Sequence, residues 1–144
     1  MDILIRPASE NDYETICRLN HEALGADYDA ESTLLRLKYL IKQTDHKIFV
    51  ADCGEIAVGY VHAANYDCTY SGPVKDIKSI AVDFQFHGIG IGRALLSTVE
   101  QWAKETGAVG IRLTSNVKRE NAHKFYLACG YTNPHNSKKF YKFF

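Results

Sequence analysis

The sequence predicts a single α/β (α+β) domain over residues 1–144, with a mixed sheet and about four helices. Two helical patterns come before most of the predicted strands, which is typical of α+β folds. Later in the chain a strand, a helix and a strand follow one another, so these two strands should be parallel. A chain of 144 residues, 46% of them hydrophobic, is long enough to bury one core.

Each element is predicted from a local pattern. Ile3 and Ile5 alternate with polar residues before Pro7, and Ser9 and Asp12 have the spacing of a capping box. Leucines at helical spacing predict the second helix, and a turn at residues 52–55 predicts a hairpin. We expect strands over residues 3–5, 48–51, 56–64, 75–82, 109–114 and 140–144, and helices over 9–25, 34–41, 92–106 and 118–129.

The strand at residues 75–82 should be half buried, because its side chains alternate. Alternation places Asp76, Lys78, Ile80 and Val82 on one face, and Ile77, Ser79 and Ala81 on the other.

A glycine-rich turn links this strand to the third helix. Gly88, Gly90 and Gly92 allow main-chain angles that bring several N–H groups together around one anion. The following helix directs its unpaired first-turn N–H groups and its positive dipole end to the same place. The turn therefore predicts a phosphate or pyrophosphate site, and its structural alternative is an ordinary tight turn. The spacing Gly-x-Gly-x-Gly is neither a dinucleotide fingerprint nor a P-loop.

Composition excludes several classes of function. Seventeen basic and seventeen acidic residues cancel, so we expect neither a nucleic-acid partner nor a membrane surface. No apolar run approaches the roughly 20 residues of a membrane span, and the N-terminus does not read as a signal peptide, so we expect a cytoplasmic protein. Four scattered cysteines predict reduced thiols, with no disulfide framework and no metal.

Two stretches resemble the GCN5-related N-acetyltransferases, the GNAT family. The run from His87 to Leu96, HGIGIGRALL, is similar to the family's acetyl-CoA motif Gln/Arg-x-x-Gly-x-Gly/Ala. The run from Asn121 to Tyr131, NAHKFYLACGY, looks like its second signature. The stretch from Leu113 to Arg119, together with residues 122–127, is also similar to aminoalkylphosphonate N-acetyltransferases. The resemblance implies a GNAT fold with a six- to seven-stranded sheet whose parallel strands splay around acetyl-CoA.

The resemblance also implies where acetyl-CoA, the expected cosubstrate, would bind. Its pantetheine arm would pair with the strand backbone, and its pyrophosphate would lie on main-chain N–H groups of the glycine turn. Asn121 and Asn116 would be side-chain contacts, although Asn121 could equally serve the start of its helix. The expected cofactor-binding residues are Ile80, Ala81, Val82, His87, Gly88, Ile89, Gly90, Ile91, Gly92, Arg93, Asn116, Asn121 and Tyr126.

Acetyl transfer to an amine needs a base for the ammonium group and an acid for the departing thiolate. The resemblance points to Asp76 as the base, with a plain strand-end aspartate as the alternative, and to Tyr126 as the acid, with a core aromatic as the alternative. His62 is either a second candidate base or a structural histidine. Three residues depart from the family pattern: Phe84 replaces a frequent proline, His87 replaces Gln or Arg, and Lys78 stands where an acidic residue is frequent.

We therefore expect an acetyl-CoA-dependent N-acetyltransferase for a small primary amine, of the aminoalkylphosphonate, polyamine, amino sugar or aminoglycoside type. The alternatives are a non-catalytic acyl-CoA sensor, a peptide or protein N-acetyltransferase, and a nucleotide-binding protein. By analogy with the family, a homodimer is a further expectation.

Overall fold

The computed structural model describes residues 2–144 and contains a mixed five-stranded sheet with four α-helices. Two compact units, Met1–Leu113 and Thr114–Phe144, make up the chain. The first contains the whole sheet and the second contains the last helix. The elements in order are β1 (Ile3–Pro7), the 3-10 turn η1 (Glu10–Asp12), α1 (Tyr13–Leu24), α2 (Ala30–Leu40), β2 (His46–Cys53), β3 (Ile56–Tyr66), β4 (Val74–Val82), the 3-10 turn η2 (Phe84–Phe86), α3 (Ile91–Glu105), β5 (Gly110–Leu113) and α4 (Glu120–Ala128).

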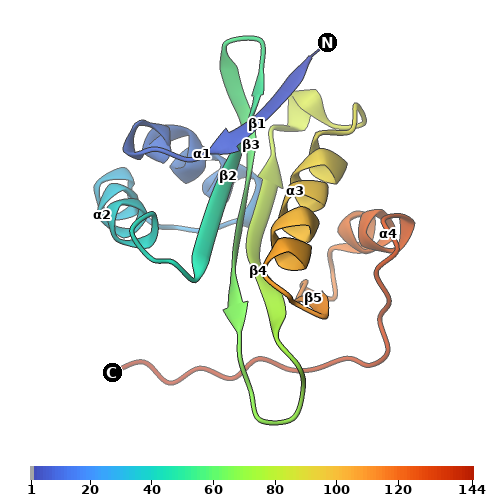
Figure 1. Cartoon of the computed structure of the whole chain (residues 1–144). Helices are drawn as coiled ribbons and strands as arrows, with labels where there is room; N and C mark the ends of the chain where they lie inside the picture. Colours follow the sequence, from blue (N-terminus) through green and yellow to red (C-terminus); the bar gives the residue numbers. More distant parts are fainter. Residues whose placement is uncertain (1) are drawn as a thin grey trace. The chain divides into compact units, whose positions relative to one another are not determined.

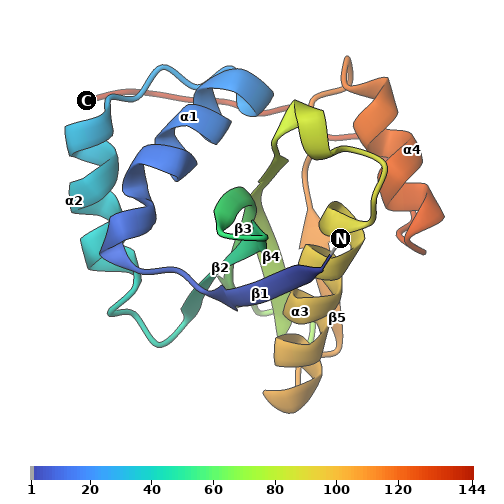
Figure 2. The same ribbon diagram turned by 90° about the horizontal axis from the view of Figure 1, so that it is seen from above.

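The strands lie in the order β1-β2-β3-β4-β5, and only β4 and β5 are parallel. Helices α1 and α2 cover one face of this sheet and α3 covers the other (Figures 1 and 2). The predicted strand-helix-strand segment with parallel strands is confirmed as β4-α3-β5.

Each face of the sheet carries part of the core. Beneath α1 and α2, the side chains of Ile16, Leu19 and Leu37 pack with those of Val50 and Tyr60. The apolar stripe of α3 is buried, with Ile91, Leu95, Leu96, Val99 and Ala103 at most 4% exposed. Burial of such side chains is the main driving force for docking the helices on the sheet.

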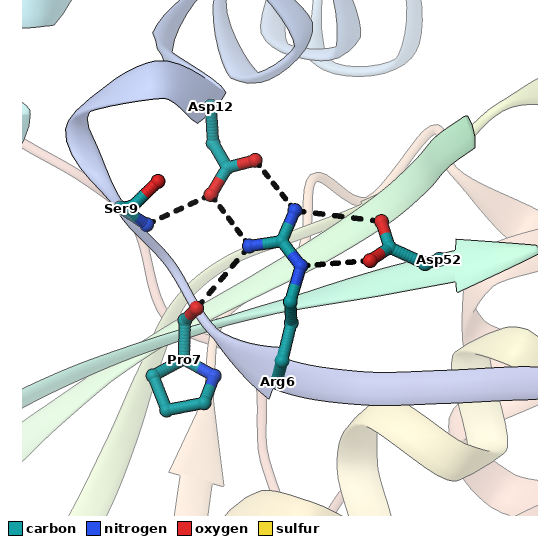
Figure 3. A network of polar contacts seen from close by, with 5 residues as sticks. All are labelled: Arg6, Pro7, Ser9, Asp12 and Asp52. Atoms are coloured by element: carbon teal, nitrogen blue, oxygen red, sulfur yellow. Dashed lines mark hydrogen bonds and ion pairs between the residues drawn. The ribbon is translucent and has the colours of Figure 1, made fainter. Parts of the chain in front are cut away.

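An ion-pair network centred on Arg6 ties β1 to η1 and β2 (Figure 3). Its guanidinium donates two hydrogen bonds to the Asp12 carboxylate, at 2.8 and 2.9 Å, and two to that of Asp52, at 2.7 and 3.4 Å. The Ser9 N–H also donates to Asp12, as the capping-box spacing predicts. Burial alone would raise the pKa of Asp12, but the hydrogen bonds from Arg6 and Ser9 lower it below the ordinary value.

Two expected elements differ in the structure. The strand predicted at 140–144 is not formed, so the described sheet has five strands and not six or seven. Its aromatic side chains are largely exposed, and a strand without cross-strand partners gains too little burial to offset its ordering. Helix α4 begins at Glu120, later than expected, because the Asn116 side chain accepts from the Lys118 N–H in a turn before it.

Across residues 2–144, the helices are too short or too polar to cross a lipid bilayer.

Candidate functional site

The parallel strand β5 is shorter than β4 and pairs with only its first half. Their pairing starts at Val74 and Gly110 and ends at Ile77 and Leu113. Strand β4 continues to Val82, so its residues 78–82, here called the β4 edge, extend beyond the last pair. Beyond Ile77, β4 has no paired strand on this side within the described sheet, and the splaying that the resemblance implies stays a prediction.

Backbone alternation shows which groups of the β4 edge face outward. The Asp83 N–H donates to the Val58 carbonyl of β3 at 2.7 Å, so Asp83 faces β3. Successive residues of an antiparallel strand direct their backbone groups to opposite sides, and Val82 and Ile80 therefore face the open edge. The Val82 carbonyl accepts a hydrogen bond from His87 Nε2 at 2.9 Å, as this orientation requires. An extended ligand could pair here with the N–H groups of Ile80 and Val82.

Ala81, the third expected residue of this strand, differs from its neighbours. By the same alternation its backbone groups face β3, where its register partner is Tyr60. Its side chain is 4% exposed and packs in the core beneath α1 and α2. Ala81 therefore supports the β4 edge and does not offer it hydrogen-bonding groups.

A β-bulge at Lys78 changes which side chains share a face of β4. His62 pairs with Ser79 and Ala63 pairs with Ile77, which leaves Lys78 without an opposite residue. Before the bulge, the Lys75 ammonium lies 3.9 Å from the centre of the Trp102 ring on α3. Asp76, the next residue, therefore faces the side of α1 and α2.

After the bulge the alternation is reversed. The Tyr60 hydroxyl donates to Asn20 Oδ1 of α1 and is hydrogen-bonded to Ser79 Oγ at 2.8 Å, so Ser79 faces the same side as Asp76. The expected grouping of Asp76 with Ile80 and Val82 is wrong, because one extra residue shifts the two-residue period.

The predicted glycine turn leads directly from the β4 edge into α3. Gly88 and Gly90 have φ values of +80° and +92°, which side-chain-bearing residues rarely adopt. Gly90 is the N-cap of α3, and the first helical residue, Ile91, is buried. The first-turn N–H groups of a helix have no intrahelical partners, so those of residues 91–93 are directed at this turn. Gly92 lies inside α3 and Arg93 is exposed in its first turn, while Ile89 is an exposed residue of the turn.

His87 fixes the start of this turn with its side chain. The His87 ring donates a hydrogen bond to the Val82 carbonyl, and its centre lies 5.8 Å from the centre of the Phe84 ring. Its N–H is directed at the Phe84 carbonyl at 3.4 Å, within η2. The His87 ring thus holds the turn against the end of β4. The position of His87 in the motif did not predict this role.

Gly59 of β3 is a residue that the sequence interpretation missed. A Cβ atom there would lie 3.2 Å from the Ala81 carbonyl oxygen and 3.3 Å from the Ile91 side chain. Both contacts are tight, so the absence of a side chain at Gly59 allows the start of α3 to approach the sheet. A single glycine inside a predicted strand was the available signal.

Asp76 holds two cations where the pairing of β4 and β5 ends. Its carboxylate oxygens lie 2.7 Å from Lys78 Nζ and 2.9 Å from Arg112 Nη1, and its side chain is 10% exposed. The Arg112 guanidinium also lies 4.1 Å from the centre of the Tyr66 ring. Lys78 and Arg112, here called the cation pair, remain 43% and 39% exposed. Arg112 was missed because only the β4-β5 register brings it beside Asp76.

His62 lies on β3 beside these charges. Burial, followed by the nearby His46, Lys78 and Arg36, lowers the pKa of His62 to about 4. Its Nε2 lies 2.9 Å from His46 Nδ1, so one ring donates a hydrogen bond to the other. His62 is therefore neutral at physiological pH and already has a partner for one nitrogen.

The other predicted residues belong to the second unit. Asn121 is exposed in the first turn of α4, and Asn116 uses its side chain in the turn before that helix. Tyr126 is 9% exposed, and its ring lies 5.4 Å from that of Phe125 and 6.3 Å from that of Tyr131. Burial raises the pKa of Tyr126, so its hydroxyl is protonated at neutral pH.

Within the described residues, His, Cys, Asp and Glu side chains do not gather into a group of three or more that could hold a metal ion.

Residues 13–131 match the family described as "Acetyltransferase (GNAT) family". Over 113 residues the chain is 30% identical to an aminoglycoside N(6')-acetyltransferase type 1 of Stenotrophomonas maltophilia, covering 75% of this chain and 74% of that protein. It is 34% identical over 76 residues to an aminoalkylphosphonate N-acetyltransferase of Salmonella typhimurium, covering 53% of this chain and 45% of that one.

Solved structures share the fold. A protein of Bacillus halodurans C-125 described as a transcriptional regulator has a TM-score of 0.88 at 26% identity, over 98% of this chain and 100% of that one. The aminoglycoside N-acetyltransferase AAC(6')-Iy in complex with CoA has a TM-score of 0.88 at 18% identity, over 98% of this chain and 95% of that one.

Proposed function

The chain belongs to the acetyltransferase (GNAT) family and is an acyltransferase of the N-acetyltransferase type, and we propose that it transfers an acetyl group from acetyl-CoA to a primary amine of a small molecule. One observation carries the choice of donor: the open β4 edge runs directly into a glycine turn that caps a helix N-terminus. The first feature suits an extended amide-containing arm, and the second suits a phosphate. Coenzyme A has both parts in one molecule.

The residues of the first unit divide this binding between them. The N–H groups of Ile80 and Val82 would pair with the pantetheine arm, and one of them would also stabilise negative charge on the thioester oxygen. N–H groups of residues 88–93 would hold the pyrophosphate, with His87 keeping the turn in place. A solved relative in complex with CoA supports this choice of ligand.

The transfer itself forms one bond and breaks one. The amine nitrogen attacks the thioester carbonyl carbon, the carbon–sulfur bond breaks, the nitrogen loses a proton and the sulfur gains one. Tyr126 remains our candidate to protonate the sulfur, since its raised pKa keeps the proton on its hydroxyl at neutral pH. Asp76 remains our candidate to accept the nitrogen's proton, and it must use lone pairs that its two cations leave free. Neutral His62 is the alternative base.

One other function, a sensor, has a specific observation behind it, and a peptide or protein acceptor is a further alternative. An acyl-CoA sensor without turnover is favoured by Lys78, which stands where the family often has an acidic residue, and by the similar protein described as a transcriptional regulator. A peptide or protein acceptor would use the same cosubstrate with a larger amine. We propose a homodimer as well, by family analogy.

Thiol release tests the proposal. The protein is mixed with acetyl-CoA and a panel of small amines, and free CoA is measured with a thiol reagent. We expect amine-dependent thiol release together with an N-acetylated product. Calorimetric binding of CoA without amine-dependent release would support a sensor, and no heat with CoA in a folded sample would overturn the proposal itself.

A further inference from the structure

An excess of positive charge lies where the pairing of β4 with β5 ends, on the face covered by α1 and α2. The cation pair Lys78 and Arg112 shares one carboxylate, Asp76. His62 adds no positive charge at physiological pH, because its pKa is lowered to about 4. Arg36 of α2 adds a third cation that acts on the same histidine. In this cluster Lys78 and Arg112 thus contribute two positive charges against the single negative charge of Asp76.

The cation pair is built into the sheet. Arg112 is held by its register partner Asp76 and by stacking over Tyr66 at 4.1 Å. Lys78 is the bulge residue, and its ammonium lies 2.7 Å from Asp76, on the side of α1 and α2. Both cations keep about two fifths of their side-chain surface exposed, at 43% and 39%, while Asp76 is nearly covered at 10%. A molecule at the end of the β4-β5 pairing would therefore meet more cation surface than carboxylate surface.

We propose that the acceptor is a small primary amine that also carries an anionic group, a phosphonate or a carboxylate, and that the cation pair binds this group. The inference rests on the proposed function, because it names the acceptor of the same transfer. A polycationic acceptor such as an aminoglycoside would be repelled by this charge, whereas an anion would form charge-assisted hydrogen bonds with it.

The positive charge also favours the reaction. An alkylammonium group has a pKa near 10 in water, so most of it is protonated at neutral pH. Nearby cations disfavour the charged form of a bound amine and so raise the fraction of neutral nucleophile. The anionic group of the acceptor provides the attraction that keeps the amine in this otherwise repulsive place.

Matched amines test the inference. The thiol-release assay is run with 2-aminoethylphosphonate and its neutral diethyl ester, with β-alanine and its neutral amide, and with kanamycin as a polycation. The first pair tests a phosphonate and the second a carboxylate. Calorimetric binding of each amine to the protein with CoA gives a readout that needs no turnover.

The variants are Lys78→Met, which removes one cation, Lys78→Arg, which keeps the charge, and Lys104→Met, a control for an exposed lysine at the end of α3. We expect kcat/KM and affinity to favour at least one anionic amine over its neutral partner by about tenfold or more, as for a hydrogen bond to a charged group. Lys78→Met should remove most of that ratio, and Lys78→Arg and Lys104→Met should retain it.

The outcomes separate the two proposals. Equal use of anionic and neutral amines, a preference for kanamycin, or a ratio that Lys78→Met leaves unchanged would overturn the anionic acceptor while leaving the acetyltransferase intact. Selective, Lys78-dependent binding of an anionic amine without any thiol release would support the acceptor class and count against catalysis.

Discussion

The open β4 edge can be tested by removing one N–H group without removing a side-chain contact to the ligand. Backbone alternation directs the Val82 N–H outward and the Ala81 N–H toward β3. Proline lacks this hydrogen and is tolerated in a strand where the N–H faces away from the neighbouring strand. We predict that Val82→Pro weakens acetyl-CoA binding and leaves the sheet folded.

The size of the effect follows from one lost hydrogen bond. A neutral hydrogen bond contributes about 0.5–1.5 kcal/mol, and leaving a buried partner unsatisfied costs about 1–3 kcal/mol. Since about 1.4 kcal/mol corresponds to a tenfold change in Kd, the affinity should fall roughly 10- to 100-fold. The pairing of β4 with β3 does not use this N–H. The midpoint of thermal unfolding should therefore fall only slightly, because the substitution removes a half-buried valine side chain.

Isothermal titration of acetyl-CoA into each variant measures the change. Val82→Ala is the matched control, because it removes the same branched side chain and keeps the N–H. Ala81→Pro is the opposite control, since it removes a hydrogen bond to β3 and should unfold or strongly destabilise the protein. Equal affinities for Val82→Pro and Val82→Ala would refute the assignment of the β4 edge as the binding strand.

Three further variants test other parts of the molecule. Gly90→Asp should abolish CoA binding in calorimetry, because it places a carboxylate at the phosphate site, whereas Gly25→Asp carries a similar strain at φ +68° and should still bind. Tyr126→Phe should lower kcat with little change in acetyl-CoA affinity, and an unchanged kcat would remove Tyr126 from the mechanism. Asp12→Asn should cost about 2–3 kcal/mol of unfolding free energy at neutral pH by urea denaturation. The pKa of Asp12 is lowered in the fold, so its contribution is present above about pH 4 and is lost as the pH falls further; the variant and the wild type should therefore converge in acid.

Local patterns predicted most of the first unit. The capping box at Ser9, the end of the first helix near Gly25 and the helix after the glycine turn all depend on neighbours within a few residues, and all are confirmed. The glycine turn is confirmed in the same way, because the φ values of Gly88 and Gly90 are intrinsic to residues without Cβ.

Features that depend on pairing between distant segments could not be predicted. The bulge at Lys78 exists only relative to β3, and the contact of Asp76 with Arg112 exists only through the register of β4 and β5. The expected strand at 140–144 failed for a related reason, since an aromatic pattern shows β propensity but cannot supply a partner strand.

The bulge residue Lys78 affects both proposed binding sites. Parallel pairing with β5 stops at Ile77, the residue before Lys78, so the open edge begins where the bulge lies. The same bulge leaves Asp76 and Ser79 on one face, so the cation pair lies on the side of α1 and α2, while Ile80 and Val82 still direct their backbone groups to the open edge. If the edge binds the acetyl donor and the cation pair binds the acceptor, the bulge sets the distance between the two substrates. Lys78→Met should then change acceptor choice and leave the Kd for acetyl-CoA unaltered, and a parallel loss of both would show that the two sites are not separable.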